Sequence, residues 1–67
     1  MEEEKVKKII EYLFTDYLND KEECIEYIDE DAVNVVYQFL TTGERKKHRF
    51  VDCIGGYDAI RRLSLLL

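Results

Sequence analysis

The chain has 67 residues, of which 46% are hydrophobic and 37% are charged, and its net charge is −5. This length predicts a single small domain over residues 1–67, and the hydrophobic content is too high for a disordered chain. No run approaches the ~20 apolar residues that a membrane span requires. Overall acidity argues against direct nucleic-acid binding, which needs a basic surface.

The charge is divided unevenly along the chain. Residues 1–32 contain twelve Asp or Glu and four Lys, a net charge of −8. Residues 33–67 contain three Asp or Glu and six Lys or Arg, a net charge of +3. Such a division favours head-to-tail attraction between copies, although two solvated faces would give the same pattern.

Residues 2–18 carry the strongest helical pattern. Glu2, Glu3 and Glu4 lie at the positive end of the expected helix, where negative charge is stabilising. Apolar side chains recur at spacings of three and four, which predicts one buried face. These side chains are Val6, Ile9, Ile10, Leu13, Phe14 and Tyr17.

Residues 21–29 predict a second, short helix. Asp20 can cap it, and Glu23 stands three residues later, as in a capping box. Cys24, Tyr27 and Ile28 then fall on one face. A strand is the alternative, because Ile25 and Tyr27 alternate with Glu26.

Residues 32–40 favour a strand, because they are rich in β-branched and aromatic side chains that alternate with others. A helix with a stripe of Val33, Val36, Tyr37 and Leu40 fits the spacing almost as well. Residues 41–44 predict a turn, and residues 48–54 predict the returning strand of a β-hairpin.

The last element is a helix that opens at Tyr57, after the glycine pair at 55 and 56, and runs to the C-terminus. The predicted fold is therefore α+β: a long N-terminal helix, a short helix, a β-hairpin and a C-terminal helix. A hairpin alone is marginally stable, so the helices must cover one of its faces.

Three segments in this order resemble the N-terminal half of nuclear transport factor 2-like domains, which include SnoaL-like and ketosteroid-isomerase-like proteins. They are the helix ending in Tyr17-Leu18-Asn19-Asp20, the segment DKEECIEYIDEDAV over residues 20–33, and Gly56-Tyr57-Asp58-Ala59-Ile60-Arg61. The resemblance implies a version truncated before the main sheet, so no catalytic residue is carried over. It also implies a remnant ligand pocket that would reach Tyr37, Phe39 or Asp52.

No catalytic, metal or cofactor site is predicted. His48 lies in the basic run Arg45–Arg49 and is interpreted as a surface residue. Cys24 and Cys53 lack the close spacing of zinc ligands, and the acidic start is not a signal peptide. The two cysteines could pair in principle, but because nothing marks the chain as secreted we expect two reduced thiols in a cytoplasmic protein. Asp29-Glu30-Asp31 predicts a turn, and Gly55-Gly56 a chain reversal.

The C-terminal run of leucines predicts a contact surface, because a chain this short has few faces on which to bury it. Tyrosines favour interfaces for a related reason, since each pairs an apolar body with a polar tip. The expected interface residues are Tyr37, Phe39, Tyr57, Leu63, Leu65, Leu66 and Leu67.

These features favour a non-enzymatic small acidic module that binds a protein partner or associates with itself, most simply as a homodimer. One alternative is an acidic inhibitor of a nucleic-acid-binding protein, of the kind that phages and mobile elements encode. The other is a ligand-binding or enzyme remnant of the nuclear transport factor 2-like superfamily.

Overall fold

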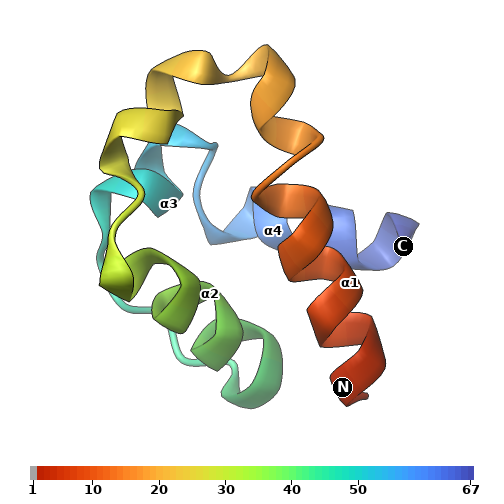
Figure 1. Cartoon of the computed structure of the whole chain (residues 1–67). Helices are drawn as coiled ribbons and strands as arrows, with labels where there is room; N and C mark the ends of the chain where they lie inside the picture. The colour runs from red at the N-terminus through yellow and green to blue at the C-terminus, as the bar shows by residue number, and fades with distance from the viewer. Residues whose placement is uncertain (1) are drawn as a thin grey trace.

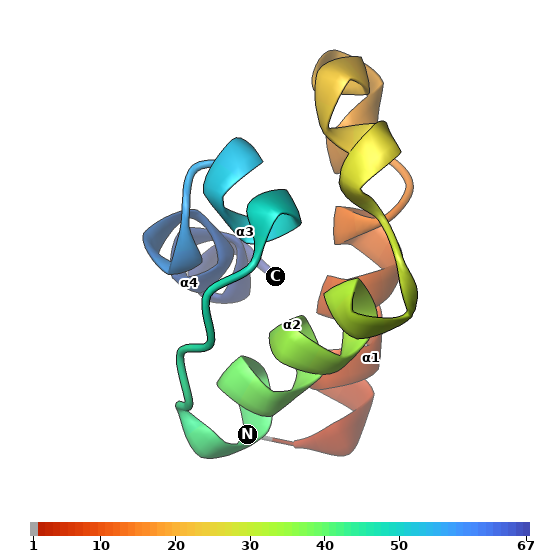
Figure 2. The same ribbon diagram turned by 90° about the vertical axis from the view of Figure 1, so that its left-hand side faces the viewer.

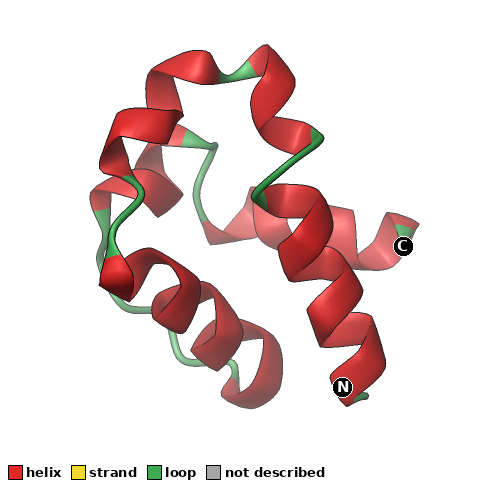
Figure 3. Cartoon of the chain, in the orientation of Figure 1, coloured by secondary structure: helices red, strands yellow, loops and turns green. Residues whose placement is uncertain are grey.

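A computed structural model describes residues 2–67, and these residues form helices joined by short loops (Figure 1). None of them lies in a strand (Figure 3), so the predicted α+β fold is wrong. The elements are four α-helices and two 3₁₀-helices: α1 (Glu3–Leu13), η1 (Tyr17–Asp20), η2 (Glu22–Tyr27), α2 (Glu30–Thr42), α3 (Arg49–Cys53) and α4 (Tyr57–Leu66).

The N-terminal helix α1 forms as predicted but ends five residues earlier, at Leu13. Val6, Ile9 and Leu13 are buried at helical spacing. After Leu13, two tertiary contacts hold Phe14 and Tyr17 outside the helix that was predicted to continue to residue 18. Phe14 stacks on Phe50, with ring centroids 5.0 Å apart, and the Tyr17 hydroxyl donates to the backbone carbonyl of Ile54 over 3.2 Å.

The predicted short helix is present as the 3₁₀-helix η2. Its three-residue repeat brings Cys24 and Tyr27 to the inner side, where Cys24 is buried. The predicted capping box is wrong, because Asp20 belongs to η1 and the residue that precedes η2 is Lys21, whose side chain makes no capping hydrogen bond.

The predicted first strand, residues 32–40, is instead the middle of α2. Asp29 caps this helix by accepting hydrogen bonds from the backbone of Asp31 and Ala32, and Gly43 ends it at a φ of 80°. Burial of Ala32, Val35, Val36 and Leu40 outweighs the β propensity of the valines. The helical alternative was right about the helix but placed its buried face incorrectly. Val36 and Leu40 are buried as it predicted, whereas Val33 and Tyr37 face outward.

The predicted returning strand, residues 48–54, is the short helix α3, which buries Phe50 and Val51. It closes in a Schellman motif, in which the Gly56 amide donates to the Val51 carbonyl over 2.8 Å and the Gly55 amide to Asp52. Gly55 has a φ of 113°, which disfavours any other residue there. The glycine pair therefore reverses the chain, as predicted.

The C-terminal helix α4 forms as predicted and packs against α2, which also contacts α1 and α3 (Figure 2). None of the described helices is long and apolar enough to cross a membrane. The side chains of the core cluster between the helices are all apolar. The core side chains are Val6, Ile9, Leu13, Leu18, Cys24, Ala32, Val35, Val36, Leu40, Phe50, Val51, Ile54, Ile60 and Leu63.

Candidate functional site

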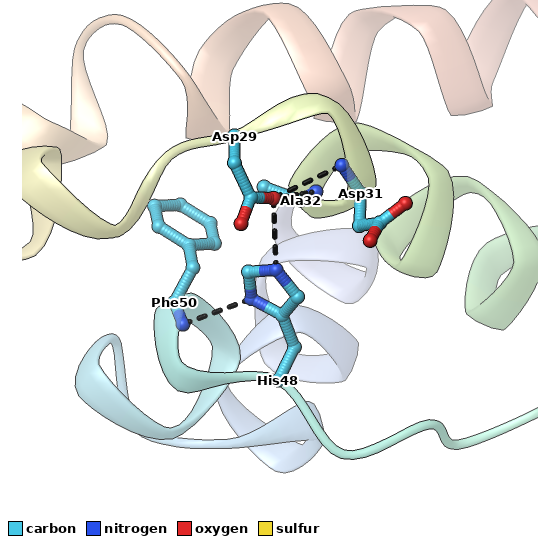
Figure 4. Close-up of polar contacts among 5 residues, drawn as sticks. All are labelled: Asp29, Asp31, Ala32, His48 and Phe50. Carbon is cyan, nitrogen blue, oxygen red and sulfur yellow. Dashed lines mark hydrogen bonds and ion pairs between the residues drawn. The ribbon is translucent and has the colours of Figure 1, made fainter.

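A hydrogen-bonded pair, Asp29 and His48, joins the starts of two helices (Figure 4). Oδ1 of Asp29 accepts from the backbone amides of Asp31 at 2.9 Å and Ala32 at 3.0 Å. The same oxygen lies 3.0 Å from Nε2 of His48. On the other side of the ring, Nδ1 of His48 accepts from the Phe50 amide over 3.0 Å and caps α3.

This pair is built for capping rather than for proton transfer. Because Nδ1 accepts a backbone hydrogen bond, the ring proton is on Nε2, which donates a hydrogen bond to Oδ1 of Asp29. Both ring nitrogens are therefore engaged, and neither is free to act as a general base. The prediction of a surface histidine missed this contact, because its partner lies 19 residues away.

The capping pair makes the stability of the domain depend on pH in the acid range. The hydrogen bond from His48, and then those from the two backbone amides, lower the pKa of Asp29 from its usual 3.8. A carboxyl with a lowered folded-state pKa stabilises the fold above its unfolded pKa, and this contribution is lost as pH falls through the folded value.

We expect Asp29→Asn to be less stable than the wild type at neutral pH, and we expect this difference to shrink as pH falls through the lowered folded-state pKa of Asp29. Asparagine keeps the capping oxygen but lacks the charge that His48 recognises. Urea unfolding of both proteins at several pH values measures the difference. A gap that stays constant down to about pH 2 would contradict this role of the carboxylate.

A polar cleft lies beside the capping pair. Its lining mixes the acidic Asp31 with the basic Lys46 and Lys47, and Oε1 of Gln38 is buried without a hydrogen-bond partner. The remaining lining residues are Asn34, Val35 and His48. The lining holds two lysines and one aspartate, so its charge is mixed with a small positive excess.

The cysteines that we predicted as free thiols form a disulfide, Cys24–Cys53, with Cα atoms 5.7 Å apart. This bond joins η2 to α3, which also pack against each other. The prediction was wrong because the two residues lie 29 positions apart and their approach depends on how α2, the 43–48 loop and α3 fold back on η2.

The C-terminal turn of α4 exposes its last leucines. Leu65 and Leu66 are 78% and 81% exposed, and Leu67 is half exposed. Arg61 and Arg62 are also exposed and lie one turn earlier on the same outer side of the helix. We call these five residues the leucine end.

An open groove joins the leucine end to α2. Leu65 and Arg61 line it together with Arg45, Phe39 and Leu40. Arg45 is partly neutralised by Asp58, since their side chains lie 3.7 Å apart. The surface around Leu65 therefore combines apolar area with positive charge.

The structure separates the predicted interface residues into three groups. Tyr37, Leu65, Leu66 and Leu67 are exposed, whereas Leu63 lies in the core. Phe39 and Tyr57 are partly buried and pack against each other with ring centroids 4.7 Å apart. The Tyr57 hydroxyl donates to the Lys46 carbonyl, and burial raises the pKa of this tyrosine. Phe39 and Tyr57 thus hold the 43–48 loop against α4.

The pocket that the family resemblance implied does not form among the described residues. Tyr37 and Asp52 are exposed, and Phe39 packs on Tyr57. The hairpin that would support such a pocket is helical.

Comparison of the chain with protein-family models, with curated proteins and with solved structures finds no match.

Proposed function

We propose that this chain is a small non-enzymatic protein-binding module that associates with copies of itself through the leucine end. The exposure of Leu65 and Leu66 carries this proposal. Complete burial of a leucine side chain contributes about 1.5–3 kcal/mol. Two adjacent leucines on the outer turn of a helix therefore supply a driving force for association if a partner covers them.

The two alternatives fit the geometry less well. An acidic inhibitor would present carboxylates in place of phosphates, but exposed Ile25 and Ile28 interrupt the acidic segment around η2. A nuclear transport factor 2-like remnant needs the hairpin that α2 and α3 replace. The disulfide also counts against the expected cytoplasmic location, because disulfides persist mainly in oxidising compartments.

We expect the double variant Leu65→Asp/Leu66→Asp to lose association while keeping its fold. Both side chains are exposed, so their replacement leaves the core intact. Sedimentation velocity over a dilution series measures association, and circular dichroism measures helix content. The wild type should sediment faster as concentration rises, whereas the variant should remain monomeric.

Two control variants separate the contact from side effects. Val33→Asp places the same charge on an exposed apolar site of α2, away from the leucine end, and should associate like the wild type. Leu65→Ser/Leu66→Ser avoids a negative charge at the C-terminal end of a helix, which is itself unfavourable. A wild type that stays monomeric at all concentrations, or a Leu65→Asp/Leu66→Asp variant that associates as before, would overturn the proposal.

A further inference from the structure

The 3₁₀-helix η2 presents a second exposed apolar surface. Residues three apart align along a 3₁₀-helix, so Glu22 and Ile25 share one row, and Ile28 follows directly after the helix. Ile25 is 49% exposed and Ile28 is 36% exposed. Cys24 and Tyr27 form a different row, which the disulfide and the core hold inward. The two isoleucines therefore face outward because the inner row is fixed.

Carboxylates surround these isoleucines. Glu22, Glu23 and Glu26 are all exposed on η2. Lys21 precedes Glu22, and no Lys or Arg occurs between residues 22 and 44, so the three glutamates outnumber the one local cation. We call Glu22, Glu23, Ile25, Glu26 and Ile28 the acidic isoleucine face.

The leucine end has the opposite charge and the same apolar character. Its Arg61 and Arg62 stand beside Leu65 and Leu66 as the glutamates stand beside the isoleucines. In Figure 1, η2 lies at the upper left and the C-terminus at the right. Arg62 is the member of the leucine end that approaches η2, since it lines a pocket with Lys21, the residue before η2. Leu65 and Leu66 lie further along α4 and stay exposed within one copy, so a second copy can cover them.

We propose that the leucine end of one copy docks on the acidic isoleucine face of a second copy, in a head-to-tail contact. This inference rests on the proposed function and names the surface that the leucine end binds. Opposite charges at the edge of the contact favour this arrangement. Docking of two leucine ends on each other would instead bring four arginines together. A head-to-tail contact leaves one free surface on each copy, so association continues into rings or chains.

The test uses two variants, each with one surface blocked. Leu65→Asp/Leu66→Asp blocks the leucine end, and Ile25→Asp/Ile28→Asp blocks the acidic isoleucine face. Each variant alone should sediment as a monomer. An equal mixture should form a dimer that does not grow, because only one productive contact remains. Size-exclusion chromatography with light scattering measures the mass of each sample.

The outcomes distinguish this inference from the proposed function. If Ile25→Asp/Ile28→Asp associates alone while Leu65→Asp/Leu66→Asp does not, the leucine end still binds but its partner surface lies elsewhere, and the head-to-tail contact is wrong. If the mixture stays monomeric, the head-to-tail contact is wrong as well. If blocking the leucine end changes nothing, or if the wild type is monomeric, both fail.

A second pair of variants, in which the charges of the two surfaces are reversed, provides the test if either aspartate variant folds poorly. Arg61→Glu/Arg62→Glu changes only exposed side chains and should weaken self-association by about tenfold. Mixing it with Glu22→Arg/Glu26→Arg should restore association between the two variants. Absence of this restoration would contradict the pairing of the two surfaces.

Discussion

Phe50→Ala is expected to unfold the domain. Phe50 is completely buried on α3 and stacks on Phe14 beneath α1. Truncation of a buried phenylalanine removes about 3–5 kcal/mol of stability. A single core in a chain of this size rarely supplies more than about 3–5 kcal/mol in total. The loss is therefore comparable with the whole free energy of unfolding.

Circular dichroism and urea unfolding of Phe50→Ala measure this effect. Phe39→Ala is the matched control, because the same change is made at a partly buried ring that packs on Tyr57 at the edge of the core. The control should remain folded with a smaller loss of stability. A Phe50→Ala protein with the urea midpoint of the wild type would show that the core is not centred on this ring.

Reduction of the Cys24–Cys53 disulfide is expected to have a similarly large effect. The bond closes a loop with a sequence separation of 29. In the chain-entropy model, a loop of that length restricts the unfolded chain enough to stabilise the fold by about 3–4 kcal/mol. Reduced protein should therefore unfold at a much lower urea concentration than oxidised protein, and a large part of it should be unfolded in the absence of urea.

Urea unfolding with and without a thiol reductant tests this expectation. The variant Cys24→Ala/Cys53→Ala should resemble the reduced wild type, and the reductant should not change it further. Mass spectrometry of alkylated protein confirms the redox state of each sample. Equal unfolding free energies for oxidised and reduced wild type would contradict a stabilising role for the bond.

The sequence predicted those elements whose signals are local. The apolar spacing of Val6, Ile9 and Leu13 identified α1, and the glycine pair before Tyr57 marked the start of α4. Residues 32–40 were ambiguous because valines suit a strand, whereas burial of Val35 and Val36 suits either structure. Asp29 decides between them as the N-cap of α2. The same residue had been interpreted only as part of a turn.

The contacts that join distant segments could not be read from spacing alone. His48 caps α3 locally, but it bonds to Asp29 only because α2 and α3 pack with their first turns together. Cys24 and Cys53 meet for the same reason. In contrast, the exposed leucines at the C-terminus were visible in the sequence, because the pattern of α4 leaves Leu65 and Leu66 on its polar side.

Concentration-dependent amide NMR tests most directly whether the leucine end binds the acidic isoleucine face of another copy. On going from dilute to concentrated protein, we expect the signals of residues 61–67 and 22–28 to shift or broaden together. Signals of the outer side of α2, such as those of Val33 and Tyr37, should stay unchanged. Spectra that do not depend on concentration, or changes confined to α2, would contradict the head-to-tail contact.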